Sequence, residues 1–532
     1  MPEAYKKNIE LNPEFLQALR IIEETDRHIF ITGRAGTGKS TLLQYFRDNT
    51  CKNVAVLAST GVAAVNIQGQ TIHSFFKFRP NITPDRAKRT RVGNKEVYKN
   101  LEAVVIDEIS MVRADLLDCM DVFLRRFGKK NKRPFGGIQM IFIGDLYQLP
   151  PVVTSGEKEL FREYYESPFF FDSKVFRDNF WPERSLIASS EMEFIELQKV
   201  YRQKDEEFLG LLNAIRNNTA SEEDMEKINR RCYPDFKENP EDFYVYLTTT
   251  NKLADRINQE KLDNLKGKQY QYEGLLKGGF EIKALPTLPE LCLKKGAQVM
   301  LLNNDSLGRW INGSVGKIVD FESVMDSPDI IRIELHDGGV VDVVPFKWEM
   351  FEFRYDRDDK RIISESTGSF AQYPIKLAWA VTIHKSQGMT FDDVIVDIGR
   401  GTFSHGQLYV ALSRCTTLKG IVLKKPVGRH NILMDRRVVS FVTGYQYSRA
   451  GEKQPIGERH ALVRKAINGQ KNLEILYLKA KDVKSRRVVI PKYAGELEYR
   501  GRKFPGLKAF CIQSKAERVF NMERILEMKI VD

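Results

Sequence analysis

One run of eight residues, GRAGTGKS at Gly33 to Ser40, constrains the fold more than any other feature of the sequence. It follows a short β-prone segment, His28 to Thr32, and precedes the helix-forming residues TLLQYFRDN. A strand, a glycine loop and a helix in this order form a P-loop, whose backbone N–H groups surround phosphate oxygens. The sequence therefore predicts an α/β domain that binds a nucleoside triphosphate.

The residue types within the run have distinct expected roles. Gly36 and Gly38 let the backbone approach phosphate, Lys39 reaches the β- and γ-phosphates, and the Ser40 hydroxyl ligates Mg²⁺. Gln17, on a helix expected to begin near Asn12, is either an adenine contact or a surface residue. The candidate ATP-binding residues in this part of the chain are Gln17, Gly36, Thr37, Gly38, Lys39, Ser40 and Thr41.

Two further strands are expected to deliver polar side chains to the same sheet edge. Ala103 to Ile106 ends at Asp107 and Glu108, and Met140 to Ile143 leads into GDLYQLPP, which contains Gln148. Strand carboxyl ends are where α/β sheets bind ligands. We expect Asp107 to hold Mg²⁺, Glu108 to deprotonate the attacking water, and Gln148 to sense the γ-phosphate. The pattern is that of a RecA-like nucleotide site.

Two more runs in the first half of the chain suit a nucleic-acid backbone. ASTGVAA follows the strand Val54 to Leu57, and GQTIHSFF comes shortly after it. Hydroxyl groups and backbone amides on strand-exit loops contact phosphates, and aromatic rings stack on bases. Phe75, Phe76 and Phe78 serve equally well as ordinary core residues. The candidates for contact with single-stranded DNA are Thr60, Gly61, Thr71, His73 and Phe75.

The second half of the chain supplies arginines and a second set of strand contacts. Arg202 lies in LQKVYRQ, and Arg414 ends the expected helix of GQLYVALSRC. Two such cations can close over a γ-phosphate and stabilise the transition state. In TIHKSQGMT, Gln387 and Gly388 are expected to face the nucleotide. The expected strand contacts are Thr250, Thr382, His384, Lys385 and Ser386.

The order and spacing of these runs resemble the Pif-one-type helicases of superfamily one, in the branch shared with RecD. The runs are GRAGTGKS, VIDEISM, GDLYQLPP, VYRQ, TIHKSQG and YVALSR, and the likeness covers residues 10 to 430. It implies ATP- and Mg²⁺-dependent 5′-to-3′ movement on single-stranded DNA by a monomer. Forked and tailed duplexes, DNA–RNA hybrids and often G-quadruplexes are the implied substrates, and DNA replication and repair the implied context.

The resemblance also implies a domain plan. A first RecA-like lobe is expected at 1–195 with a small wedge insertion at 77–100. A second RecA-like lobe is expected at 196–442, with an SH3-like β-barrel insertion at 304–372. Trp310, within that insertion, is interpreted as a core residue rather than a DNA contact.

The last part of the chain is predicted to be a separate basic module. The chain has net charge +12, and residues 451–532 hold 19 Lys and Arg against 10 Asp and Glu, a net +9. A polar linker is expected at 443–457, followed by a small β-rich domain at 458–532 that resembles a WYL domain. The chain departs from that family at Pro505 to Leu507, where a Trp-Tyr-Leu run is usual. The expected DNA contacts are Tyr477, Arg486, Arg487, Arg518 and Arg524, although a structural or protein-docking role is also open.

Composition narrows the alternatives. The six cysteines are widely spaced and no long apolar run occurs, which predicts a cytoplasmic protein without disulfides, zinc or membrane spans. The bacterial nucleoid is the location that the helicase resemblance implies. A P-loop switch that does not move along nucleic acid has no need of a second strand-binding lobe. An RNA helicase stays open as an alternative, and a nuclease is disfavoured because no further acidic cluster occurs.

Overall fold

The structure is a computed structural model that describes residues 11–154, 156–176, 192–203, 205–239, 241–399, 401–402, 404–499 and 501–531. It divides into two compact units. The larger comprises Met1–Val175, Ser190–Arg216 and Ala220–Leu433, and the smaller consists mainly of Met434–Asp532. Within the described ranges, no helix combines the length and the apolar character that crossing a membrane would require.

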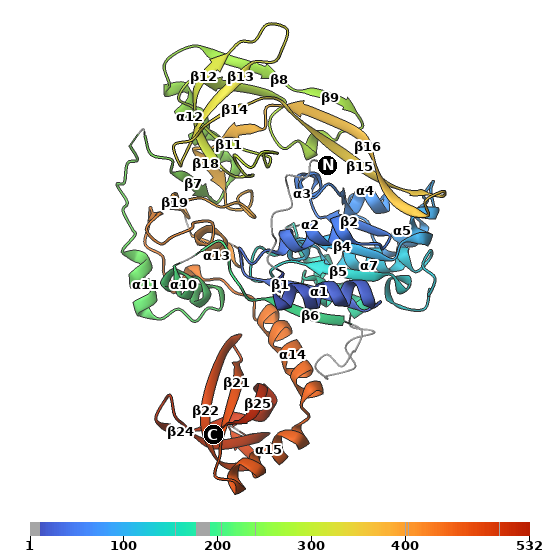
Figure 1. Ribbon diagram of the computed structural model, residues 1–532, viewed down its shortest axis with the longest axis vertical. Coiled ribbons are helices and arrows are strands. Elements are labelled where there is room, and N and C mark those ends of the chain that lie inside the picture. The colour runs from blue at the N-terminus through green and yellow to red at the C-terminus, as the bar shows by residue number, and fades with distance from the viewer. Residues whose placement is uncertain are drawn as a thin grey trace. The chain divides into compact units, whose positions relative to one another are not determined.

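The first half of the larger unit is built on a parallel six-stranded sheet in the order β3-β2-β4-β5-β1-β6 (Figure 1). Three of its inner strands are buried along their whole length, as expected where helices cover both faces of a parallel sheet. The four strands predicted for this half are confirmed to within one residue at each end. The sheet contains β1 (His28–Gly33), β2 (Val54–Ala58), β3 (Gln70–Thr71), β4 (Ala103–Asp107), β5 (Gln139–Ile143) and β6 (Met192–Leu197).

Short polar side chains define where the helices of this half begin. Asn12 accepts a hydrogen bond of 2.8 Å from the Phe15 N–H at the start of the first helix, with Pro13 in the first helical position. Thr60 and Thr71 cap two later helices in the same way. The helices are α1 (Pro13–Glu24), α2 (Lys39–Asn49), α3 (Gly61–Asn66), α4 (Ile72–Phe76), α7 (Ala114–Leu124) and α8 (Lys158–Tyr164), with 3₁₀ turns at Ile109–Met111, Pro134–Gly137 and Phe170–Asp172.

The predicted wedge segment, 77–100, holds two short helices, α5 (Pro84–Arg89) and α6 (Glu96–Asn100). Helix α5 packs against α7. Arg126 also holds the segment in place, because its guanidinium donates hydrogen bonds to the carbonyls of Ala87 and Thr90. The segment is therefore packed onto the first half of the larger unit by contacts along its length.

Phe75 was predicted to contact DNA, and the structure places it in the core instead. Its side chain is 3% exposed and meets Phe76, Tyr98 and Phe353 edge-to-face at 4.9–5.8 Å between ring centroids. Phe76 and Phe78 are buried as well. The sequence run could not separate the two readings, because an aromatic ring suits a base and a hydrophobic core equally.

The second half of the larger unit is a smaller parallel sheet in the order β18-β7-β19-β20. Its strands are β7 (Val245–Thr248), β18 (Ala380–Thr382), β19 (Val394–Asp397) and β20 (Ile421–Leu423). Its helices are α10 (Glu206–Arg216), α11 (Glu222–Asn229), α12 (Asn251–Asn264) and α13 (Gln407–Leu412), with a 3₁₀ turn at Arg429–Asn431. The helical stretch predicted to open at Tyr201 begins at Glu206 instead.

A β-rich insertion lies between α12 and β18, and it is longer than predicted. Strand β11 pairs with both β12 and β17, so the sheet needs strands on either side of 304–372. Trp310 is confirmed as a core residue at 6% exposure. The strands are β8 (Gln269–Glu273), β9 (Leu275–Gly278), β10 (Glu290–Lys294), β11 (Gln298–Leu301), β12 (Val315–Glu322), β13 (Ile330–Leu335), β14 (Val340–Val343), β15 (Phe346–Asp356), β16 (Arg361–Gln372) and β17 (Ile375–Leu377), with a 3₁₀ turn at Ile282–Ala284.

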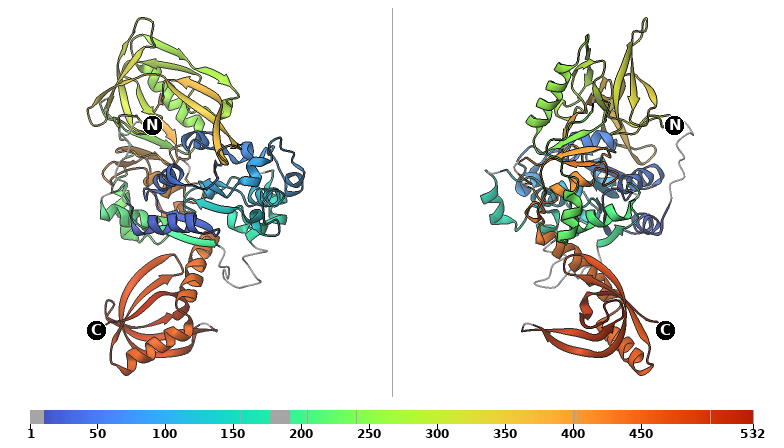
Figure 2. Two further views of the ribbon diagram at one scale, coloured as in Figure 1. Left: turned by 45° about the vertical axis from the view of Figure 1, so that its right-hand side comes forward. Right: turned by 90° about the vertical axis from the view of Figure 1, so that its left-hand side faces the viewer.

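Strands β15 and β16 form a long antiparallel hairpin that runs from the insertion to the first half of the larger unit (Figures 1 and 2). Asn53 holds it there, because its side chain donates to the Lys360 carbonyl at 3.2 Å and accepts from the Ile362 N–H at 2.8 Å. Lys77 pairs with Glu352 at 2.7 Å. The hairpin therefore joins the two halves of the larger unit.

Within the described residues, the smaller unit contains two helices and an antiparallel sheet in the order β24-β23-β22-β21-β25. The predicted linker is wrong for most of its length, because helix α14 (Arg436–Lys453) covers residues 443–453. That helix buries the small or polar residues Thr443, Gly444 and Gln446, so the sequence lacks apolar periodicity there. The remaining elements are α15 (Ile456–Asn468), β21 (Asn472–Lys479), β22 (Val483–Tyr499), β23 (Arg502–Cys511), β24 (Ala516–Asn521), a 3₁₀ turn at Met522–Arg524, and β25 (Ile525–Val531).

Candidate nucleotide and nucleic-acid site

The P-loop connects β1 to α2. Gly36 and Gly38 adopt φ values of +81° and +85°, which glycine reaches without steric strain. The Lys39 ammonium folds back over the loop and donates to the carbonyls of Gly33 at 2.8 Å and Arg34 at 3.0 Å. Burial lowers the pKa of Lys39, while the nearby carboxylates of Asp145 and Glu108 oppose that shift. A phosphate at this loop would replace two carbonyl partners with a full counter-charge.

The two predicted acidic residues lie at the carboxyl end of β4, where Asp107 is its last residue and Glu108 follows it. Asp107 accepts from the Glu108 N–H at 3.0 Å, and Glu108 has the left-handed φ of +50°. Gln387, from the second half of the larger unit, donates to the Glu108 carboxylate at 3.0 Å. Burial, and then the charge of Asp107, raise the pKa of Glu108 to about 7. A carboxyl with that pKa is suited to take a proton from water near neutral pH.

The Ser40 hydroxyl and the Asp107 carboxylate fit the requirements of a magnesium ion. Mg²⁺ binds through one or two protein oxygens and completes its shell with phosphate and water. Burial raises the pKa of Asp107, so a cation beside it would relieve the cost of its ionised form. Ser40 and Thr41 are exposed on the first turn of α2. Among the described residues, no group of three or more His, Cys, Asp or Glu forms a metal site.

Gln148 is held by a residue that the sequence analysis missed. Its side-chain amide donates to the Asp145 carboxylate at 3.3 Å, and Asp145 is completely buried. Arg216, at the end of α10, donates to the same carboxylate at 3.2 Å and lies 3.9 Å from the ring centroid of Tyr147. The two paired side chains are 3% and 0% exposed. This ion pair joins the two halves of the larger unit beside the P-loop.

The two predicted arginines are found on the P-loop side of the second half. Arg202 packs so tightly on Gly36 that a Cβ there would lie 2.5 Å from its own Cβ. Its guanidinium donates to the carbonyls of Ser413 at 3.3 Å and Gly388 at 3.1 Å. Arg414 is 1% exposed, and its guanidinium hydrogen-bonds to backbone carbonyls and the Ser413 hydroxyl. Burial, and then the charge of Arg202, lower the pKa of Arg414 to about 9.

A tyrosine of the second half contacts the P-loop directly. The Ala35 N–H donates to the Tyr409 hydroxyl at 3.1 Å, and the Tyr201 N–H donates to the Gly36 carbonyl at 2.8 Å. Gln17, by contrast, is exposed on α1. Phe15 is the residue of that helix that approaches the loop, since its ring would lie 3.1 Å from a Cβ on Gly38. The geometry defines a P-loop nucleotidase whose site is closed by a second lobe.

Most of the residues predicted to contact single-stranded DNA lie on the expected loops. Several of their hydroxyl groups, however, form hydrogen bonds within the protein. Thr60 and Thr71 cap helices, and a Cβ on Gly61 would lie 2.5 Å from the Ala284 Cβ of the insertion. Ser386 is buried and donates to the Ile383 carbonyl at 2.9 Å. Two further predicted contacts are the half-buried His73, whose pKa is lowered by burial, and the exposed Thr250.

In the second half, Lys385 is exposed like Thr250, whereas the other predicted contacts are buried or half-buried. Thr382 is buried and its hydroxyl accepts from the Lys385 N–H at 3.3 Å, while burial lowers the pKa of His384. Lys376 on β17 was not predicted. Burial, and then the charge of Lys385, lower the pKa of Lys376 to about 8, so two cations lie together there. No short motif surrounds Lys376, and only the fold brings it to this site.

Four of the five residues predicted in the smaller unit divide between two faces of its sheet, and Arg524 lies in the 3₁₀ turn before β25. Arg487 lies 5.9 Å over the Phe520 ring, and Tyr477 meets the same ring edge-to-face at 5.3 Å. The register places Arg518 on that face too, because it pairs with the buried Ala509. Burial raises the pKa of Tyr447 to about 12, and the nearby charge of Arg524 opposes that shift. Arg486 is on the opposite face and pairs with Glu474 at 2.6 Å and Glu527 at 3.3 Å.

The comparisons with known proteins identify the family. The family model for PIF1-like helicase matches residues 11–226, and that for the UvrD-like helicase C-terminal domain matches residues 377–422. The chain is 31% identical over 451 residues to ATP-dependent DNA helicase Pif1 of Bdellovibrio bacteriovorus, covering 82% of this chain and 93% of that protein. The chain therefore belongs to the PIF1-like helicase family.

Two solved structures support the same assignment. Bacteroides sp Pif1 in complex with ADP-AlF4 is 33% identical with a TM-score of 0.72, over 83% of this chain and 97% of that one. Bacteroides Pif1 bound to ssDNA is 34% identical with a TM-score of 0.57, over 82% of this chain and 97% of that one.

The pKa of Glu108 leads to a prediction about stability. Because its folded pKa of about 7 lies above the ordinary 4.5, the native state retains a proton that the unfolded chain releases between these values. Stability is therefore lost as pH rises through that window. We expect Glu108→Gln to abolish hydrolysis yet stabilise the protein at pH 8 by about 1–3 kcal/mol, with little effect at pH 5. Thermal unfolding at the two pH values measures this, and a gain independent of pH would contradict it.

The Asp145–Arg216 pair leads to a second prediction. Removal of either partner leaves the other charge buried, which costs about 3–5 kcal/mol. We expect Asp145→Asn and Arg216→Gln each to destabilise the protein and to lower kcat more than nucleotide affinity. The double variant should lose much less free energy of unfolding than the sum of the losses in the two single variants. Unfolding and steady-state ATPase measurements on all four proteins test this, and additive losses would show that the two side chains act separately.

Proposed function

We propose that this protein couples ATP hydrolysis to 5′-to-3′ movement along single-stranded DNA and separates tailed and forked duplexes. The enzyme class, an ATP-dependent DNA helicase, follows from membership of the family. The observation that carries the motor role is the meeting of both lobes at the P-loop, where Gln387 contacts Glu108 and Arg202 packs on Gly36. A nucleotide bound there touches both lobes, so its hydrolysis changes how strongly they hold together.

The proposed chemistry assigns each group of the site one task. Lys39, Arg202 and Arg414 balance the charge that develops on the transferred phosphoryl group. Glu108 takes the proton of the attacking water, and Gln148 positions that water or the γ-phosphate. When bound through Ser40 and Asp107, Mg²⁺ neutralises phosphate charge.

The proposed track for the DNA strand crosses both lobes. Thr60, Thr71 and His73 on the first lobe, and His384 and Lys385 on the second, lie on loops at the carboxyl ends of parallel strands or directly after them. Lys376 adds a second cation beside Lys385. Hydroxyls, amides and cations of this kind contact the sugar–phosphate backbone without reading sequence. Direction, and activity on DNA–RNA hybrids and G-quadruplexes, are proposed from the family resemblance, as is action as a monomer.

Strand displacement tests direction and motor activity together. We expect duplexes with a 5′ single-stranded tail to be unwound in the presence of ATP and Mg²⁺, and 3′-tailed duplexes of equal length to persist. Lys39→Ala is the matched control, which should abolish turnover and unwinding while retaining strand binding. Unwinding of the 3′-tailed duplex alone would overturn the proposed direction. ATPase stimulation by RNA that equals stimulation by DNA would favour an RNA helicase.

We also propose that the smaller unit binds single-stranded DNA and improves retention on the track. One face of its sheet carries Arg487 and Arg518 together with the partly exposed ring of Tyr477, which packs on the buried Phe520. Cations interleaved with aromatic rings are typical of surfaces that hold unpaired nucleic acid. A location in a reducing cytoplasm, at the nucleoid, is proposed from the wide spacing of the cysteines and from the helicase family.

The two faces of this sheet provide a matched experiment. Arg487→Gln with Arg518→Gln should weaken binding to oligo(dT) and flatten its salt dependence, by a slope change of about 1. Arg486→Gln is the control, because that side chain is already paired with two carboxylates on the opposite face. Fluorescence anisotropy over a salt series measures both. Equal effects of the double variant and the control would contradict a binding role for this face.

A further inference from the structure

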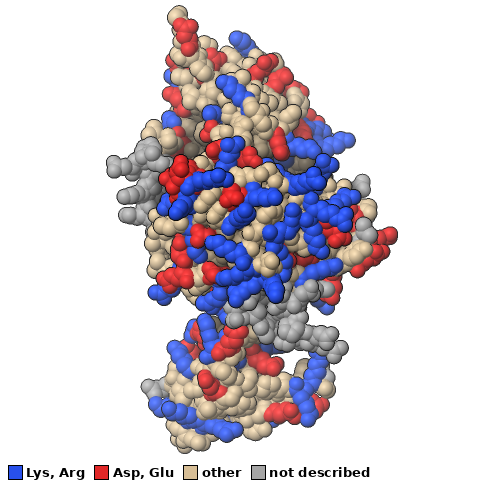
Figure 3. All heavy atoms as spheres, turned by 90° about the vertical axis from the view of Figure 1, so that its right-hand side faces the viewer, with Lys and Arg blue, Asp and Glu red and all other residues tan. Residues whose placement is uncertain are grey.

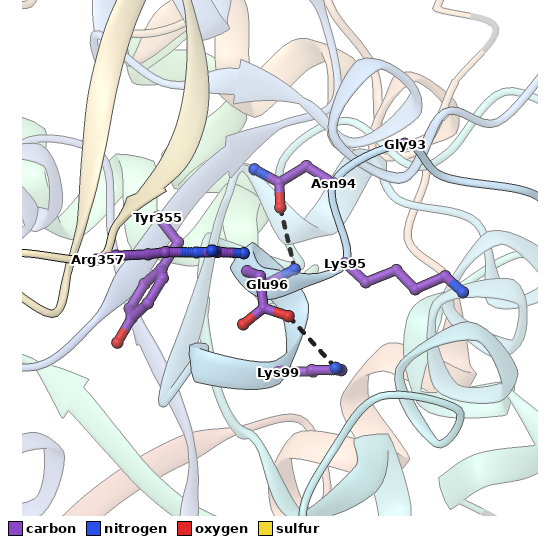
Figure 4. A pocket seen from close by; sticks show the side chains of 7 residues that line it. All are labelled: Gly93, Asn94, Lys95, Glu96, Lys99, Tyr355 and Arg357. Carbon is purple, nitrogen blue, oxygen red and sulfur yellow. Dashed lines mark hydrogen bonds and ion pairs between the residues drawn. The ribbon is translucent and has the colours of Figure 1, made fainter.

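Two cavities outside the nucleotide site lie on the wedge segment, 77–100. The first, of about 540 Å³, lies between this segment and the end of the β15–β16 hairpin (Figure 4), and we call it the hairpin cavity. The second, of about 550 Å³, lies within the segment itself, and we call it the helix cavity. The nucleotide and strand assignments above use neither cavity.

Both cavities are lined by cations. Lys95, Lys99 and Arg357 line the hairpin cavity, with one carboxylate, that of Glu96. The lining of the helix cavity includes four cations and no acid: Lys77, Arg79, Arg86 and Arg91. Figure 3 shows Lys and Arg side chains gathered on this side of the larger unit. Over residues 77–99 the sequence has 8 Lys and Arg against 2 Asp and Glu, a net +6. A surface of this kind attracts a polyanion.

Most of these charges are not used in holding the fold together. Glu96 pairs with Lys99 at 3.3 Å, and Lys77 with Glu352. In the described part of the chain, no carboxylate lies within ion-pair distance of the cations Arg79, Arg91, Lys95 and Arg357. Like charges held close together without counter-charges destabilise a protein, and a bound phosphate backbone removes that repulsion.

The hairpin cavity adds an aromatic ring to the cations. Tyr355, the last residue but one of β15, lines it and is partly exposed. In Figure 4 the Arg357 side chain extends from the hairpin toward α6. An aromatic ring with neighbouring cations suits unpaired nucleic acid, because a free base stacks on the ring while the phosphates meet the cations. A base inside a duplex is already stacked and is not available for that contact.

These cavities begin where the proposed DNA track ends. Helix α4, which carries His73, ends at Phe76, and the Phe78 N–H donates to the His73 carbonyl at 2.8 Å. Lys77, which lies between Phe76 and Phe78 in the sequence, lines the helix cavity. The Phe353 N–H of the hairpin donates to the Gln70 side-chain oxygen at 3.2 Å, which holds the hairpin beside β3, just before α4. A duplex that is opened at this end of the track has its second strand, which does not enter the track, beside the two cavities.

We propose that the hairpin and helix cavities bind the displaced strand, the one that does not pass through the track, as the duplex is opened. The proposal rests on the proposed helicase function and names a second DNA strand as a ligand. Phosphates of that strand lie against Arg79, Arg91, Lys95 and Arg357, and one unpaired base stacks on Tyr355. Capture of the displaced strand prevents it from re-pairing behind the junction, so that unwinding of a fork is favoured.

The experiment compares two substrates that differ only in the displaced strand. One is a duplex with a 5′ oligo(dT) tail, and the other is a fork that also has a 3′ oligo(dT) tail. We expect the wild-type protein to unwind the fork several-fold faster. Lys95→Ser with Arg357→Ser should bring the two rates together, and should leave the ATPase activity on oligo(dT) unchanged. Affinity for the fork should fall, and its salt slope should change by about 1.

Two controls separate local from general effects. Lys266→Ser with Lys295→Ser removes the same charge from exposed positions of the larger unit outside both cavities, and should retain the fork advantage. Tyr355→Phe should retain it as well, since the ring is kept, whereas Tyr355→Leu should reduce it. Variants whose circular dichroism and thermal unfolding match the wild type are compared.

The outcomes distinguish this proposal from the proposed function. Wild-type protein without DNA-stimulated ATPase activity would contradict the helicase function itself. With that activity intact, the capture of the displaced strand is overturned by any of three results. These are equal wild-type rates on the two substrates, a fork advantage that survives the Lys95 and Arg357 changes, and the same loss in the Lys266 and Lys295 control.

Discussion

The buried arginines beside the P-loop are the interaction on which the contact between the two halves of the larger unit depends. Arg414 is almost completely enclosed, it lies near Arg202, and both guanidinium groups have mainly backbone carbonyls as partners. Placing such groups in a low-dielectric interior is costly unless a counter-charge is present. A triphosphate supplies that charge. A nucleotide bound at the P-loop would therefore interact with cations of the second lobe as well as with the first lobe.

The buried pair of Asp145 and Arg216 makes this arrangement possible without a nucleotide. It places one compensated ion pair across the interface, with Gln148 and Tyr147 packed around it. The interface can then form in the free protein, and the uncompensated cations are kept close to where phosphate arrives. Tyr409 contributes in the same way through its hydrogen bond to the Ala35 N–H. One ion pair and one hydrogen bond to the backbone thus connect the two halves of the larger unit beside the P-loop.

What the sequence could predict depended on whether a signal was local. The P-loop, the acidic pair after β4 and the two arginines stand in short runs with fixed spacing, and the structure places them around one loop. Arg216, Tyr409 and Lys376 have no such run. Their positions follow from packing between segments far apart in the chain. The early start of the β-rich insertion and the helical linker were missed for a related reason, since pairing and burial there depend on partners elsewhere.

The hairpin of β15 and β16 has a mechanical consequence. Its base belongs to the insertion of the second lobe, and its far end is fastened to the first lobe by Asn53 and Lys77. Any change in the separation of the lobes must therefore be taken up along its length or by release of its end. A register shift between Met350 and Phe351 interrupts the ladder, and such bulges let a strand bend. The hairpin therefore connects the two lobes through a ladder that is interrupted at one point, where the strand can bend most easily.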